Sequence, residues 1–280
     1  MHDLSYAMGS IKRTVDESAK TDTFSSVKLL RSSGFENHYI ADENESVLDL
    51  AIKAVEPIRD RLKNLDSIIW ASCIPENATV GNRESFEKSK DVKPLMDYPA
   101  SRLQSHLGMP QAIVLGLVQQ ACTSMLGSIR VACGLLATEI DFNNILCITS
   151  DRFPLGAKYE QAYNLISDGA ACCIVSREQK GFRILASHHI TNGSAVQAND
   201  EETAAVYFTY MNRIVNEILE KVKITIDDLD WIIPQNINQK AWQILSRILK
   251  IDLDQVFAEP MSEVAHCISG DNIINLKHLN

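Results

Sequence analysis

Short apolar runs alternate with longer helical patterns along most of the chain, and this alternation constrains the fold more than any other feature. Strands of the buried type are predicted at 65–73, 112–117, 144–151, 165–178 and 229–235. Helices are predicted at 46–62, 101–108, 122–140, 205–222, 239–251 and 271–279. Because strands separated by helices usually form a parallel sheet with helices on its faces, the sequence predicts an α/β fold.

Strand–helix units occur in both parts of the chain, which predicts a duplicated architecture with halves 1–178 and 179–280. The run at 181–191 is the expected hairpin partner of the strand before it, and 76–97 and 192–202 are predicted to be polar loops. The chain stops inside a helical pattern without a cap or a closing glycine. We therefore expect the second half to be truncated.

Composition and charge exclude several classes of function. The net charge of -9 argues against a nucleic-acid surface, which needs clustered Lys and Arg. The N-terminal segment has no basic region followed by an apolar core, and we expect no run long enough to cross a membrane. The cysteines are odd in number, and most lie in apolar runs typical of reduced core thiols. These features predict a soluble cytoplasmic protein.

Motifs for metals and nucleotides are also missing from the sequence. No Cys-x-x-Cys or His-x-x-x-His pair is present, so we predict no zinc site. Neither a Gly-x-Gly-x-x-Gly motif nor a P-loop motif occurs. We expect no bound metal or cofactor.

The segment AIVLGLVQQACTSMLGSIRVACGLLA carries the strongest chemical signal. In it Cys122 follows a strand pattern and opens a helix that is almost free of charge. Unpaired amides and the positive end of a helix dipole lower the pKa of such a thiol, and the amides can donate to an oxyanion. Cys122 is thus a candidate nucleophile. The alternative is a plain core cysteine, as we expect for Cys133, Cys147, Cys172 and Cys173.

A nucleophilic cysteine needs a base that the fold brings close to it. Among the histidines His38, His106, His188, His189, His266 and His278, the best placed is His266, in the loop SEVAHCISGDNIINL. Asp271 follows five residues later and could accept the second imidazole N–H, which would fix the tautomer. The alternative for Asp271 is an N-cap or first-turn carboxylate on the helix after it, and the two roles are compatible.

Four segments, in order, carry the motifs of one known family. QQACTSMLGSIRVACGLL is similar to the nucleophile segment of the ketoacyl-ACP synthase III-like branch of the thiolase superfamily. SDGAACCIVS resembles its Asp-Gly-Ala turn and strand, and DLDWIIPQNINQKAWQIL resembles its strand followed by Pro-His-x-x-Asn. VAHCISGDNIINL resembles its late loop, which ordinarily carries a Gly-Asn pair. The likeness spans residues 45–280 and implies a thiolase-type duplicated α-β-α-β-α layered fold.

Departures from the family pattern change the expected chemistry. Condensing members use a Cys together with a catalytic His and a catalytic Asn. In this sequence Gln235 stands at the position of the catalytic His, and His266 stands at the position of the catalytic Asn. Asn238 matches a different residue, the Asn that ends the Pro-His-x-x-Asn segment. Cys122, His266 and Asp271 instead match a non-condensing subgroup with a Cys-His-Asp triad. Gln235 and Asn238 are kept as weaker substrate-binding candidates. The resemblance also implies a Gly-rich loop that completes the oxyanion hole, in a segment that would follow Asn280.

The resemblance implies an acyltransferase that takes an acyl group from a CoA or acyl-carrier-protein thioester, often in secondary metabolism. The alternatives are a condensing enzyme that forms a 3-oxoacyl product, and an inactive or truncated homologue that supports an active partner. The expected partners are acyl-CoA or an acyl-carrier protein, and a second copy of the chain in a homodimer.

Overall fold

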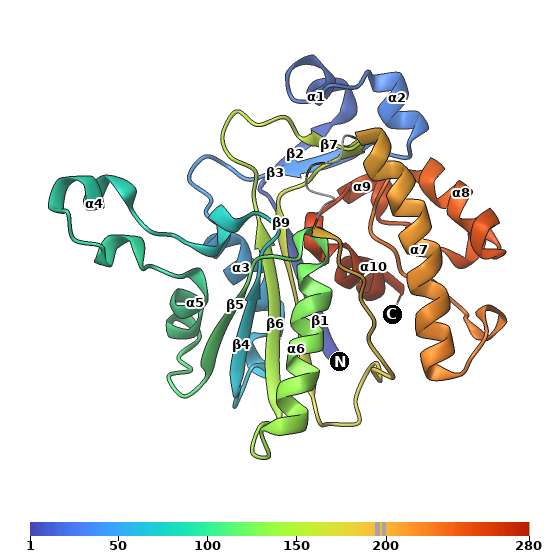
Figure 1. Ribbon diagram of the computed structural model, residues 1–280. Coiled ribbons are helices and arrows are strands. Elements are labelled where there is room, and N and C mark those ends of the chain that lie inside the picture. Colours follow the sequence, from blue (N-terminus) through green and yellow to red (C-terminus); the bar gives the residue numbers. More distant parts are fainter. Residues whose placement is uncertain (194–196, 198–199, 280) are drawn as a thin grey trace.

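The structure is a computed structural model that describes residues 1–193, 197 and 200–279. Its centre is a five-stranded sheet with the strand order β1-β9-β6-β4-β5 (Figure 1). The strands are β1 (His2–Met8), β4 (Ser67–Ala71), β5 (Ile113–Leu117), β6 (Asn144–Asp151) and β9 (Gly169–Ser176). β4 runs parallel to β5 and β6, whereas β9 is antiparallel to both β6 and β1. The sheet is therefore mixed.

Helices cover both faces of this sheet because successive strand residues point to opposite sides. Ile145 and Cys147 of β6 pack with α6 (Ser124–Thr138) and α10 (Asp271–Leu279). Leu146 and Ile148 pack on the other face with α3 (Val47–Val55) and α5 (Pro99–Leu107). The core thus consists of three layers, and Figure 1 shows α6 lying along the sheet.

The remaining elements surround these layers. The helices are α1 (Val15–Thr21), α2 (Val27–Ser32), α4 (Arg83–Ser89), α7 (Asp200–Val222), α8 (Gln239–Leu249) and α9 (Met261–Val264). β2 (Ile11–Thr14) pairs with β3 (Asn37–Ile40), and β7 (Glu160–Gln161) pairs with β8 (Asn164–Leu165). Figure 1 shows α4 on an arm that extends away from the sheet, with α7 and α8 on the opposite side of the molecule.

Most predicted elements are confirmed. The first four predicted strands become β4, β5, β6 and β9, and the predicted helices become α3, α5, α6, α7, α8 and α10. Gly108 ends α5 in the left-handed conformation with a φ of 68°, which glycine adopts without steric cost. The predicted loop 76–97 contains the short helix α4. Part of the predicted loop 192–202 lies outside the described residues.

The strand expectations at the edges of the pattern are wrong. β9 pairs with β1, and 181–191 forms no strand. The letters HDLSYAM are only partly apolar, and a register shift lies between His2 and Ser5, so the alternation is weak. In 229–235 only Ile232 forms a bridge, to Val256. A strand is stable only when its backbone pairs with a neighbouring strand. A segment with a strand-like sequence but no pairing partner therefore has an irregular conformation. The described residues after 178 hold no second sheet.

The segment Ala121–Thr138 contradicts the expectation that no run could cross a membrane. By length and composition alone this helix is long and apolar enough to do so, with a mean hydropathy of 1.3. In the fold it packs Met125, Ile129 and Ala132 into the core against the sheet. A core helix of a soluble protein passes the same test, so the segment is weak evidence for a membrane span.

Candidate active site

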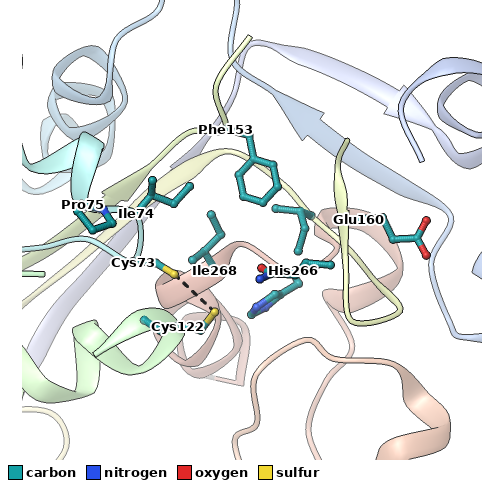
Figure 2. Close-up of a pocket in the computed structure, with 11 residues that line it drawn as sticks. Cys73, Ile74, Pro75, Cys122, Phe153, Glu160, His266 and Ile268 are labelled. Carbon is teal, nitrogen blue, oxygen red and sulfur yellow. Dashed lines mark hydrogen bonds between the residues drawn. The ribbon is translucent and has the colours of Figure 1, made fainter. Parts of the chain in front are cut away.

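A cavity of about 480 Å³ lies where the chain leaves β4, β5 and β6. The carboxyl ends of parallel strands meet at one edge of a sheet, so residues distant in sequence come together there. The cavity wall combines two thiols and an imidazole with apolar side chains, and Figure 2 shows these groups around one space. They are Cys73, Cys122, His266, Ile74, Phe153 and Ile268.

Cys122 lies in the 3-10 turn Ala121–Thr123, directly before α6, so its predicted position at a helix start is confirmed. Ala121 has a φ of 45°, a left-handed conformation that is strained for a residue with a Cβ atom. Ser269 Oγ donates to the Ala121 carbonyl at 3.2 Å, and the Gln235 side-chain amide donates to the Cys122 carbonyl. Groups from the C-terminal half thus hold the turn that carries the thiol.

His266 and Asp271 form a buried pair beside this turn. The imidazole Nδ1 contacts Asp271 Oδ2, and the Asp271 carboxylate also accepts backbone N–H bonds from Cys267 and Asn236, both at 2.7 Å. Asp271 is 0% exposed, and these donors compensate the loss of its hydration. An Nδ1–H that donates to Asp271 leaves Nε2 as the basic nitrogen.

The structure also distinguishes His266 from the other histidines, all of which lie in the described part of the chain. Only His266 lines the cavity. Its main chain is anchored at the end of β8, since its N–H donates to Leu165 and its carbonyl accepts from Ser167. Asp271 begins α10, so it is both the partner of His266 and a first-turn carboxylate, as the sequence allowed.

The expected low pKa of the Cys122 thiol is wrong. Its contact with Cys73 raises the pKa of Cys122 well above the ordinary value, and burial and the carboxylates of Asp271 and Asp151 raise it further. The two sulfur atoms lie 3.8 Å apart. These effects act in the direction opposite to the helix dipole that the local sequence suggested. Cys122 therefore rests as a thiol that needs a base before it can attack.

The weaker candidates Gln235 and Asn238 are placed differently from each other. Gln235 is joined to the nucleophile through the Cys122 carbonyl. Asn238 caps α8, where its side-chain oxygen accepts from Lys240 N–H at 3.0 Å, and its amide donates to Ser33 at 2.9 Å. Neither Gln235 nor Asn238 lines the cavity, and the contacts of Asn238 join its loop to α8 and to Ser33.

Cys73 is a site residue that sequence reasoning missed. It follows β4, and the buried Asp151 carboxylate accepts the N–H groups of Cys73 and Ile74 at 3.0 and 3.1 Å. The available signal was its position at the carboxyl end of the predicted buried strand 65–73, where parallel sheets place functional residues. It was overlooked because Cys73 lacks a helix start or a charged neighbour.

Comparisons with known proteins show which sequences the chain resembles. The family model of 3-oxoacyl-[acyl-carrier-protein (ACP)] synthase III matches residues 118–193, which include Cys122. The β-ketoacyl-[acyl-carrier-protein] synthase III of Rhizorhabdus wittichii is 22% identical over 265 residues, which cover 86% of this chain and 77% of that protein.

Solved structures show the same fold. The 3-oxoacyl-[acyl-carrier-protein] synthase III of Aquifex aeolicus VF5 superposes with a TM-score of 0.79 at 18% identity, covering 98% of this chain and 88% of that one. ChlB3, described as an acyltransferase, superposes with a TM-score of 0.78 at 15% identity, covering 99% and 87%. The chain therefore has the thiolase-type α/β fold.

Proposed function

Because the sequence of this chain is similar to 3-oxoacyl-[acyl-carrier-protein] synthase III proteins and its fold is of the thiolase type, we propose that it is an acyltransferase working through a Cys122 acyl-enzyme. The observation that carries the proposal is the His266–Asp271 pair, whose imidazole lines the same cavity as the Cys122 thiol. A thiol with a base and an orienting carboxylate is an arrangement used in nucleophilic acyl transfer.

The proposed reaction has two steps. His266 Nε2 takes the proton of the Cys122 thiol, the thiolate attacks the carbonyl carbon of a CoA or carrier-protein thioester, and the departing thiolate recovers the proton from the imidazolium. His266 then takes a proton from an alcohol or amine, whose oxygen or nitrogen attacks the acyl-enzyme and releases Cys122. Asp271 stabilises the imidazolium formed in each step. The raised pKa of Cys122 supports this route, because a resting thiol requires a base.

The cavity wall supports an apolar acyl group. Ile74, Phe153, Ile166 and Ile268 line the cavity together with Cys122, and burial of methylene groups against such side chains favours binding. Glu160 and Gln161 also line it and belong to its polar part. No bound cofactor is required, since the thioester itself is the substrate. The acyltransferase description of ChlB3 supports the proposed transfer chemistry, for which we propose a role in secondary metabolism of lipids or polyketides.

Trapping of the acyl-enzyme tests the proposal. The full chain is incubated with radiolabelled short-chain acyl-CoA, denatured, and analysed for label retained as a thioester. We expect label on the wild type and on Cys133→Ala, a matched cysteine on α6 outside the cavity, and none on Cys122→Ala. Label that survives Cys122→Ala contradicts the proposal. If neither acyl-CoA nor acyl-loaded carrier protein labels the chain, the result favours the alternative that the chain is an inactive homologue that supports an active partner.

Condensation is the second candidate, and the names of the synthase III relatives favour it. Decarboxylation of a malonyl thioester requires stabilisation of the negative charge that develops as carbon dioxide leaves. Gln235 is neutral, and its amide is engaged by the Cys122 carbonyl. We therefore expect acylated protein to release no carbon dioxide from malonyl-ACP. Release that depends on Cys122 would make condensation the function.

We also propose a homodimer formed through β5. This strand ends the sheet order and pairs only with β4 among the described strands. Ile113 and Leu115 on it are 45% and 36% exposed. An exposed apolar strand edge is suited to pairing with another chain, and its covering by a second copy would remove it from solvent.

A further inference from the structure

Cys73 and Cys122 differ from the other close thiol pair of the described chain. Cys147 and Cys173 face each other across β6 and β9 in the fully buried core. Cys73 and Cys122 lie 3.8 Å apart, sulfur to sulfur, and both line the cavity (Figure 2). A small oxidant that enters the cavity can reach this pair, whereas the core pair is shielded.

The backbone on each side of the pair is fixed. Asp151 holds the N–H groups of Cys73 and Ile74, and Gln235 holds the carbonyl of Cys122. Each sulfur is one side-chain bond beyond a Cβ atom, so rotation of the two side chains changes the 3.8 Å sulfur–sulfur separation. A disulfide requires sulfur atoms about 2 Å apart and compatible Cβ positions. The two sulfur atoms are thus in contact, and a disulfide requires that they approach further.

We propose that Cys73 is a resolving thiol that joins Cys122 in a reversible disulfide when the protein meets a peroxide. The disulfide does not depend on the proposed acyl transfer. Its regulatory consequence, closure of the nucleophile to acyl groups, rests on that function.

The oxidation balances with hydrogen peroxide as the oxidant. His266 accepts the Cys122 proton, the thiolate attacks one peroxide oxygen, and the oxygen–oxygen bond breaks to give the sulfenic acid and hydroxide, which becomes water with the proton from His266. The Cys73 sulfur then attacks the Cys122 sulfur, the sulfur–oxygen bond breaks, and a second water leaves with the Cys73 proton. Two thiols and one peroxide give one disulfide and two waters. A dithiol reductant reverses the reaction and is itself oxidised.

The benefit of the neighbour is chemical. A sulfenic acid that finds no thiol is oxidised further to a sulfinic acid, which dithiols do not reduce. Cys73, in contact with the nucleophile, diverts Cys122 from that loss into a form that can be recovered. The pair therefore acts as both an off-switch and a protection of the nucleophile.

Peptide mapping of the full chain tests the proposal. Trypsin places Cys73 in peptide 64–83 and Cys122 in peptide 103–130, each with a single cysteine. After hydrogen peroxide and an iodoacetamide quench, we expect these peptides to be linked in the wild type and in the control Cys133→Ala, and released by dithiothreitol. In Cys73→Ala we expect peroxide to oxidise Cys122 to a sulfinic acid. Iodoacetamide then no longer labels Cys122, and dithiothreitol does not restore the labelling. Cys73→Ser serves the same purpose if the alanine variant does not fold.

The outcomes separate the two proposals. Unlinked peptides, together with sulfinic acid at Cys122 forming as fast in the wild type as in Cys73→Ala, overturn the resolving role. Linked peptides in a protein that never accepts an acyl label leave the disulfide standing and reject the acyltransferase. Linked peptides with acyl labelling that falls to background on oxidation and returns with dithiothreitol support the complete switch.

Discussion

The imidazole of His266 contacts a carboxylate, Asp271, that is completely buried and accepts further hydrogen bonds from the main chain. A buried carboxylate is stabilised through its hydrogen-bond partners, because it has no contact with water. The partners of Asp271 are the imidazole of His266 and the main chain of Cys267 and Asn236, so Asp271 holds these groups together. The pair joins the end of a loop to the first turn of α10, beside the turn that carries Cys122.

Asp271→Asn keeps the size of the side chain and removes its charge. The imidazolium that forms when His266 takes a proton then has no anionic partner, so we expect the rate of Cys122 acylation to fall about a hundredfold to ten-thousandfold. Asp230→Asn, at an exposed position, is the control and should keep the wild-type rate. Single-turnover acylation at neutral pH measures the effect. Equal rates in both variants would remove Asp271 from the mechanism.

The reactivity of Cys122 should depend on pH and on Cys73. A thiol whose pKa lies above its ordinary value is protonated at neutral pH, so its thiolate fraction and its alkylation rate rise as pH increases. Contact with Cys73 is the leading cause of the raised pKa. Cys73→Ala should therefore shift the iodoacetamide rate profile of Cys122 to lower pH, while Cys133→Ala leaves it in place. An unmoved profile in Cys73→Ala would contradict the assigned cause.

The contribution of Asp168 to the stability of the fold should decrease as pH rises. Burial raises its pKa from 3.8 to about 6, so the folded state binds more protons than the unfolded state between these values. Its contribution to the free energy of unfolding consequently falls as pH rises through this window. Asn does not titrate, so the Asp168→Asn variant does not lose stability in this way as pH rises. The free energy of unfolding of the variant minus that of the wild type should therefore increase by about 2 kcal/mol from pH 4 to pH 7.

Urea unfolding at the two pH values measures this difference, with the exposed Asp227→Asn as the control. Asp168 accepts hydrogen bonds from Ala41 N–H, Phe153 N–H and the Tyr159 hydroxyl, so the variant loses stability at every pH. Only the change with pH reports the titration. A relative stability that stays constant or falls toward neutral pH would reject the raised pKa.

Ile113→Lys should disrupt the proposed dimer. A lysine on the exposed edge of β5 places a charge where a second strand would pair, and like charges then face each other across the two-fold axis. We expect the dissociation constant to increase at least about tenfold, which corresponds to about 1.4 kcal/mol. Ile140→Lys makes the same change at an exposed position outside β5. Sedimentation over a range of concentrations should show monomers for the first variant alone.

The sequence predicted the centre of the fold because its elements have strong local patterns. Buried runs such as those of β4 and β6 are apolar on both faces, and the charge-poor helix α6 follows a clear strand. β1 could not be predicted in this way, since its pairing with β9 depends on residues more than 160 positions away and its own pattern is weak. Pairing partners are a property of the whole chain.

The site was predicted in part for a related reason. Cys122, His266 and Asp271 each carry a local motif, and the fold places His266 and Cys122 at one cavity and Asp271 against His266. The pKa of Cys122 depends on Cys73, which lies 49 positions earlier and reaches the site only through the sheet. A helix start is visible in sequence, but the groups that face it are not. The roles proposed for these residues remain predictions until they are tested.

The anchoring of the Cys122 turn by Ser269 and Gln235 has a consequence for biosynthesis. Ser269 lies 148 positions after Ala121, so on the ribosome the thiol emerges long before its base and its anchors. Since domains fold progressively as they are synthesised, a nascent chain carries Cys122 without the histidine that is its proposed base. If acyl transfer proceeds as proposed, base-assisted loading of Cys122 is confined to molecules in which α10 has docked beside the turn, so the loaded fraction reports on the folding of this segment.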